Sequence, residues 1–185
     1  MEKSFKLNSA DKIIGGLDRL KQQRNFPKTV TFPFEKSYKD IVCVIKTVEI
    51  SAECILYDSV ESFNYTTDFR DADYWKESCS REDIDNWWIF GQNGQGDLWL
   101  FDKSGKVYFY DHDKEEMCVE NFIELGIDFA KWIQLADLSK QYEELYCNEE
   151  TCFDNGLLKS TFANDYKERL KELSFKLLEN YPFKI

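Results

Sequence analysis

Hydrophobic positions near the start of the chain recur at helical spacing. Ile13, Ile14, Leu17 and Leu20 fall on one face of a helix, which predicts an amphipathic helix over residues 9–24. This helix has to end before Pro27, because the residue that precedes a proline is disfavoured in the helical conformation.

The pattern then changes to β-branched and apolar runs, which are typical of strands. Residues 40–50 (DIVCVIKTVEI) form such a run between polar flanks and are predicted to be a buried strand. Residues 52–57 are predicted to be a second strand, and residues 59–63 to begin a short helix.

Residues 87–125 alternate between aromatic, apolar runs and compact turn signals. Strands are predicted at residues 87–90, 97–102, 107–110 and 117–125. The connections between them are the glycine-rich GQNGQG at residues 91–96, a turn at residues 103–105 and a turn at residues 111–114. Strands joined by short turns are antiparallel neighbours, because parallel pairing requires a long crossover. The predicted fold class is α+β, an antiparallel meander with helices packed against it.

Apolar residues return to helical spacing near the carboxyl end, which predicts a helix over about residues 164–180. Its apolar stripe consists of Tyr166, Leu170, Leu173, Leu177 and Leu178. A chain of 185 residues is long enough to bury one core. We therefore expect a single domain over residues 1–185, with an N-terminal helix and lead-in (1–40), a sheet core and helix (41–135) and a C-terminal helical extension (136–185).

Residues 64–85 (NYTTDFRDADYWKESCSREDID) fit neither period. The segment is polar and acidic with interleaved aromatic residues, and connections of this length are often functional or mobile. Exposed aromatic residues among charges of one sign are typical of a protein-binding surface. The candidate contact residues are Asp68, Asp71, Asp73, Tyr74, Trp75 and Glu77, with Asp97 of the later glycine-rich turn. The alternative is a helical insertion whose aromatic residues pack on the core.

The charge of the chain narrows the choice of partner. It has 35 acidic and 24 basic residues, for a formal net charge of -11. Nucleic acid and anionic membrane surfaces repel such a chain, because binding to either needs Lys and Arg. A basic protein would be attracted to it. We expect a protein partner, no nucleic acid and no membrane, and a monomer or weak dimer.

Neither a metal site nor a targeting segment is evident. The six cysteines are scattered without a CxxC pair and the chain has one histidine, which argues against a structural zinc site. Cys147 and Cys152 are close enough in sequence to pair under oxidation, although buried free thiols fit a cytosolic setting better. The sequence holds no run of about 18 apolar residues and no signal-peptide core in its first residues. We expect a cytoplasmic protein.

The glycine-rich turn matches no nucleotide-binding or calcium-binding motif. A phosphate loop needs Lys and then Ser or Thr after its last glycine, whereas Gly96 is followed by Asp97 and Leu98. A dinucleotide fingerprint needs a helix where a strand is predicted. An EF-hand loop needs alternating acids and a final Glu, and this turn has neither.

The only histidine lies between two carboxylates, in Asp111-His112-Asp113. Neighbouring residues on a strand point to opposite faces, so this triplet does not converge on one metal without help. A general base would need a second polar partner, which no motif identifies. We favour a hydrogen-bonded turn histidine, and expect no catalytic residue, metal or cofactor. An enzyme whose site is assembled from distant residues is the alternative.

Three motifs follow one another within residues 87–135. In the first motif, a strand ending in IFG is followed by a glycine-rich turn that ends in Gly-Asp, and then by an apolar strand that ends in Asp. The second motif is GKVYFYDHD and the third is FAKWI. In this order they resemble the core of the SUKH superfamily, which has a similar G-x-V-Y-F-Y-D-H-E strand and turn and an F-x-x-F/W-L/I helix. The resemblance is carried by Gly91, Gly96, Asp97, Asp102, Val107, Tyr108, Asp111, His112, Phe129 and Trp132. The Leu-Pro helix signature of the family is not recognisable before Ile41.

The resemblance implies a non-enzymatic α+β domain. Most bacterial members are regarded as immunity proteins that bind and neutralise a toxin domain, and eukaryotic relatives are regulators linked to cell-wall synthesis. The excess of acidic residues favours an immunity protein, which would cover the active site of a basic, nuclease-type toxin. A regulatory or scaffold adaptor is the alternative. Tyr74 and Trp75 are the expected anchors of the contact.

Overall fold

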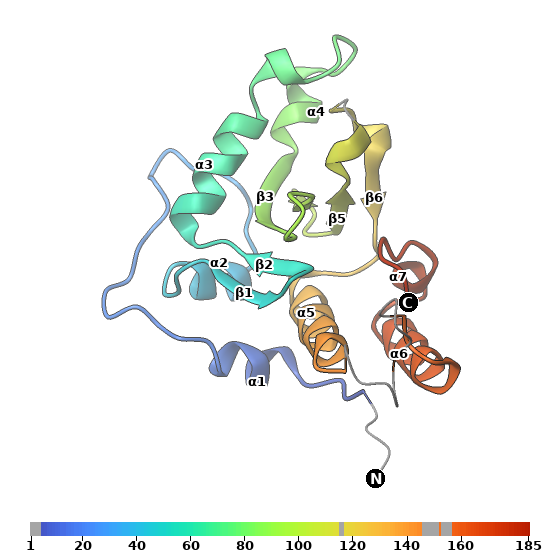
Figure 1. The fold of residues 1–185 in the computed structure, drawn as a ribbon. Helices are drawn as coiled ribbons and strands as arrows, with labels where there is room; N and C mark the ends of the chain where they lie inside the picture. Colours follow the sequence, from blue (N-terminus) through green and yellow to red (C-terminus); the bar gives the residue numbers. More distant parts are fainter. Residues whose placement is uncertain (1–4, 115–116, 146–151, 153–156) are drawn as a thin grey trace.

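The computed structural model describes residues 5–114, 117–145, 152 and 157–185. Its centre is a six-stranded antiparallel sheet in which each strand pairs with the next along the chain, in the order β1-β2-β3-β4-β5-β6 (Figure 1). The strands are β1 (Val48–Ser51), β2 (Cys54–Leu56), β3 (Trp87–Gln92), β4 (Leu98–Asp102), β5 (Val107–Tyr110) and β6 (Phe122–Glu124). The predicted α+β class and its antiparallel meander are confirmed.

Helices surround this sheet. The α-helices of the described residues are α1 (Ala10–Gly15), α2 (Lys36–Val42), α3 (Ser59–Phe69), α4 (Arg81–Asp85), α5 (Phe129–Glu143), α6 (Ser160–Leu173) and α7 (Phe175–Glu179). Short 3₁₀ turns are η1 (Ala72–Tyr74), η2 (His112–Lys114) and η3 (Val119–Asn121). None of the described helices has the length and apolar character that crossing a membrane requires.

Side chains alternate across the strands and fill a core on each face of the sheet. Trp88 and Phe90 of β3 enter the larger core, which also contains Phe129 and Trp132 of α5. Their neighbour Trp87 enters a smaller core beneath the segment that follows α3. Because both faces are covered, β3 reads as a continuous apolar run instead of an alternating one.

The helix α3 takes the place of a neighbouring strand along part of β3, and lies beside it in Figure 1. Only Gly91 and Gln92 of β3 pair with β2. Further along this edge, Thr66 Oγ1 accepts a hydrogen bond from Ile89 N (2.9 Å), and Arg70 Nε donates to Trp87 O (3.1 Å). Side chains of a helix therefore satisfy backbone groups that a strand would otherwise pair.

The glycines of the predicted family motif have separate structural reasons. Gly91 lies at a bulge in β3, where an added Cβ would collide with the backbone oxygen of Ile55. Gly96 has a φ of 98°, a conformation that favours glycine. The other turn is organised by Asp102, whose Oδ1 accepts hydrogen bonds from the backbone of Ser104 (2.9 Å) and Lys106 (3.1 Å).

Two predicted elements in the first fifty residues are wrong in part. The helix predicted over residues 9–24 ends at Gly15, where two successive glycines disfavour helix. Residues 40–42 close the helix α2, so the strand predicted over residues 40–50 exists only as β1. A short apolar run has no period that separates a buried helix from a buried strand.

Three other predicted elements differ from the structure in their bounds. The helix predicted from residue 59 continues to Phe69, so residues 64–69 are helical. The strand predicted over residues 117–125 is only β6, because η3 precedes it. Ser174 has extended backbone and divides the C-terminal helix into α6 and α7, although four stripe residues are buried as predicted, namely Tyr166, Leu170, Leu173 and Leu177. The suggested pair Cys147–Cys152 includes a residue outside the described ones.

Candidate functional site

The segment after α3 is held in one conformation by its own polar groups. Asp71 caps η1, accepting a hydrogen bond on Oδ1 from Asp73 N (3.1 Å). Trp75 follows with 6% of its surface exposed, and its Nε1 donates to Phe69 O (2.6 Å). The Trp75 ring lies edge-on to the rings of Phe69 and Phe122, with centroids 5.1 and 5.7 Å away.

This anchoring presents one aromatic residue and several acids to solvent. Tyr74 is 64% exposed. The exposed acids around it are Asp68, Asp71, Asp73 and Glu77. We call these five residues the η1 surface. Five of the seven residues that the sequence singled out for partner contact therefore lie on this surface.

The other two predicted contact residues are corrected by their burial. Trp75 packs in the smaller core beneath the η1 surface, so its prediction as an exposed anchor is wrong. Asp97 is buried as well, and its carboxylate accepts hydrogen bonds from within the protein, so it does not offer that group to a protein partner. Aromatic residues in an acidic segment can serve either as an anchor or as core, and burial decides between them.

Further acids near the η1 surface come from other elements. Glu82 and Asp83 are exposed on α4, and Glu120 is exposed on η3. A hydrogen bond from its own backbone amide lowers the pKa of Glu120, and the positive charge of Lys76 acts in the same direction. Trp75 pairs with Met117, and this bridge joins the segment of the η1 surface to the chain that leads into η3. No local sequence signal identifies such a contact.

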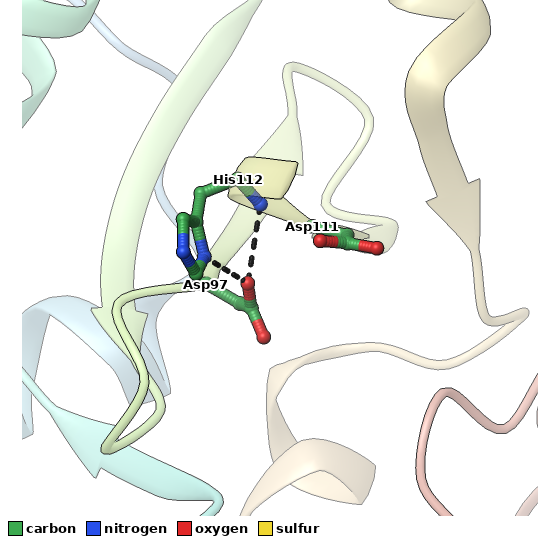
Figure 2. A group of neighbouring side chains, drawn as sticks. All are labelled: Asp97, Asp111 and His112. Carbon is green, nitrogen blue, oxygen red and sulfur yellow. Dashed lines mark hydrogen bonds and ion pairs between the residues drawn. The ribbon is translucent and has the colours of Figure 1, made fainter. Parts of the chain in front are cut away.

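A second polar cluster lies at the end of the sheet, where the β3–β4 turn meets the end of β5 (Figure 2). His112 Nδ1 lies 2.6 Å from Asp97 Oδ1, and His112 N donates to the same oxygen at 3.1 Å. Only 10% of the Asp97 side chain is exposed, against 50% for His112. The interpretation of His112 as a hydrogen-bonded turn histidine is confirmed, and its partner comes from another turn.

The glycine-rich turn places Asp97 through Asn93. Asn93 Oδ1 accepts hydrogen bonds from Gln95 N (3.0 Å) and Asp97 N (2.9 Å), which folds the turn back on itself. Asn93 Nδ2 donates to Asp97 Oδ2 (2.9 Å) and so fixes the carboxylate. The sequence analysis missed Asn93, although an Asn in a glycine-rich turn is a recognisable signal for a side chain that bonds nearby backbone.

Acidic neighbours affect the protonation of His112. The hydrogen bond to Asp97 raises the pKa of His112, and the negative charges of Asp97, Asp113 and Asp111 act in the same direction. Asp113 Oδ1 lies 3.5 Å from the other ring nitrogen, Nε2. Asp111, Asp97 and His112 have ligand atoms within 4.8 Å of one another, close enough to be a candidate metal-binding group.

Two grooves of the described surface lie away from both groups of residues. One of about 710 Å³ runs between the N-terminal segment and β1, and Ile13, Leu17 and Val48 are among its lining residues. Another of about 420 Å³ lies beside α3 and is lined in part by Phe32 and Arg70. Neither includes a residue of the η1 surface or of the Asp97–His112 cluster.

No protein-family model, curated protein or solved structure matches this chain. The resemblance to the SUKH superfamily therefore stays a prediction, carried by the motifs in residues 87–135.

Proposed function

We propose that this protein is a non-enzymatic binding domain, an immunity protein that neutralises a cognate toxin domain by covering its active site. The observation that carries the proposal is the η1 surface, where Tyr74 is 64% exposed among four exposed carboxylates. The resemblance to SUKH immunity proteins supports it, and the proposed site of action is the cytoplasm.

The charge of the η1 surface supports a basic partner. A nuclease-type toxin has a positive cleft that binds a phosphate backbone, and carboxylates such as Asp68 and Asp73 would take the place of phosphates there. Opposite charges chiefly accelerate association, and this acceleration falls with ionic strength. The net charge of -11 acts in the same direction at longer range.

Tyr74 is the proposed anchor of the complex. Tyrosine is enriched among the residues that dominate binding energy, because it buries a large apolar ring and retains a hydroxyl for hydrogen bonding. Trp75, fixed in the core directly after it, restricts how far Tyr74 can move. A preorganised segment loses less conformational entropy on binding than a flexible loop.

Binding should be tested with the carboxy-terminal domain of a large secreted protein encoded beside the gene. The full chain and this domain are titrated by calorimetry at low and moderate salt, and association and dissociation rates are measured at both. Tyr74→Ala is expected to raise Kd at least about 30-fold, mainly through faster dissociation. The double variant Asp68→Asn/Asp73→Asn should mainly slow association and weaken its salt dependence.

The matched control is Asp11→Asn, an exposed acid of α1 at the opposite end of the molecule in Figure 1. It removes one charge without touching the η1 surface, so both rates should stay close to those of the parent. Binding that resists Tyr74→Ala would remove the η1 surface from the mechanism. No binding to any neighbouring toxin domain would overturn the immunity function and favour the regulatory adaptor.

A further inference from the structure

The cluster at the end of the sheet combines one imidazole with two carboxylates, and the proposed function does not use it. We propose that it binds a divalent transition-metal ion of the zinc type. The proposed ligands are one carboxylate oxygen from each of Asp97 and Asp111 and His112 Nδ1, the ring nitrogen that lies 2.6 Å from Asp97 Oδ1. Water completes the coordination on the exposed side of His112.

The separations between the ligand atoms suit one ion after a small adjustment. One ligand atom of each of the three residues lies within 4.8 Å of the other two. Zinc bonds of about 2.0–2.2 Å place the ligands of one ion about 3 to 4 Å apart. His112 Nδ1 and Asp97 Oδ1 lie 2.6 Å apart, so these two atoms would separate by roughly 1 Å as the ion replaces the hydrogen bond between them. The two turns that carry Asp97 and His112 are already joined through the hydrogen bond from His112 N to Asp97 Oδ1.

Neighbouring groups orient the proposed ligands, as they do around established metal sites. Asn93 Nδ2 holds the second oxygen of Asp97, which leaves Oδ1 directed at His112. When Nδ1 binds a metal, the neutral ring carries its proton on Nε2, and Asp113 Oδ1 lies 3.5 Å from that atom. A carboxylate beside the far nitrogen of a ligating histidine is a recurrent arrangement at zinc sites.

The electrostatics of the cluster favour a cation. Three carboxylates, from Asp97, Asp111 and Asp113, surround the single imidazole. Among the described residues, no lysine or arginine forms an ion pair with any of the three. A bound divalent ion would offset the negative charge of these carboxylates.

The ligand chemistry separates zinc from the harder cations. Imidazole nitrogen suits Zn²⁺ and related transition metals, whereas Mg²⁺ and Ca²⁺ prefer oxygen ligands throughout. A bound ion would link the β3–β4 turn to the start of η2 and so stabilise that end of the sheet. This inference does not depend on the proposed function, because the η1 surface shares no residue with the cluster.

The single histidine allows a direct test. The full chain, without an affinity tag and after chelator treatment, is titrated with ZnCl₂ while the ¹⁵N signals of its one imidazole are followed by NMR. The signal of Nδ1 is expected to shift on saturation, and the melting temperature is expected to rise with zinc concentration. An imidazole spectrum unchanged by zinc, or a shift confined to Nε2, would overturn the site.

Variants assign the remaining ligands by calorimetry. Asp111→Asn and His112→Ala are expected to raise the Kd for Zn²⁺ at least about tenfold, whereas Asp11→Asn should leave it unchanged. Cys79→Ser tests whether zinc binds the one described cysteine that is not buried, and loss of binding in this variant would overturn the proposal. Because His112→Ala removes a hydrogen bond, Asp111→Asn keeps the test valid if the alanine variant is unstable. Zinc binding that survives both ligand variants would equally exclude the site.

Discussion

Tyr74 and Trp75 are adjacent aromatic residues with opposite environments. Tyr74 is 64% exposed on η1, whereas Trp75 is 6% exposed and contacts Phe69 and Phe122 below it. The two side chains are therefore expected to report on different properties. Tyr74 is assigned to binding, and Trp75 to the stability of the segment that presents it.

Replacing Trp75 tests this division at the level of one residue. Trp75→Ala is expected to lower the free energy of unfolding by about 3–5 kcal/mol, because it leaves a cavity in the smaller core. Urea denaturation followed by circular dichroism measures the change. Tyr74→Ala serves as the control and should change stability by less than about 0.5 kcal/mol, since its side chain is exposed. Comparable stability losses in the two variants would contradict the assignment.

At the scale of elements, α3 acts as a substitute for a strand. Its polar face contains Ser62 and Thr66, both buried, and both hydroxyls are directed at backbone groups of Ile89. This contact explains why α3 has polar residues where a helix packed on a sheet usually has apolar ones. It also covers a strand edge that would otherwise have unpaired backbone groups.

Replacing Thr66 by valine tests the role of α3 while the volume of the side chain is kept. Thr66→Val is expected to destabilise the protein by about 1–3 kcal/mol, because Ile89 N loses its buried acceptor. Hydrogen exchange should show earlier loss of protection at the Ile89 amide than in the parent. The control is Thr67→Val, whose hydroxyl is exposed and bonds only to Phe63 O of the same helix. Equal effects of the two variants would argue against edge capping by α3.

At the scale of the whole molecule, the carboxylate of Glu124 connects β6, the last strand of the sheet, to the C-terminal helix α7. Lys176 Nζ of α7 lies 2.6 Å from Glu124 Oε2, and Lys106 Nζ lies 3.4 Å from Oε1. Asn180 also donates to Glu124 O (2.9 Å). These contacts hold α7 at the end of β6.

The pH dependence of stability should report this connection. The hydrogen bond from Lys176 holds the pKa of Glu124 below its ordinary value of 4.5, and Lys106 contributes in the same direction. Because the folded-state pKa is lowered, the stabilisation is present above pH 4.5 and is lost as the pH falls through the folded-state value.

Glu124→Gln measures the size of this effect. The variant is expected to lose up to about 1 kcal/mol at pH 7, since the pair is partly exposed, and the difference from the parent should shrink near pH 3. Thermal melts across this pH range provide the comparison. Glu179→Gln, which changes an exposed acid of α7, should follow the parent throughout. A difference independent of pH would rule out the ionised carboxylate as its source.

The sequence alone determined the order and pairing of the central strands. Short turns such as Lys103-Ser104-Gly105 leave room only for antiparallel neighbours, so local signals were sufficient for the meander. The glycine-rich turn was assigned in the same way, since Gly96 has the positive φ that its residue type favours. The acidic character of residues 64–85 also followed from composition, whereas the exposure of the aromatic residues among them did not.

The tertiary structure alone decided which chemically capable residues are accessible and which ones meet. Trp75 and Tyr74 have similar side chains and adjacent positions, and only packing against Phe122 buries one of them. Asp97 and His112 are 15 positions apart, and the pairing of β4 with β5 brings them within hydrogen-bonding distance. Periodicity reports the face of an element, whereas burial and side-chain encounters depend on what the rest of the chain places against that face.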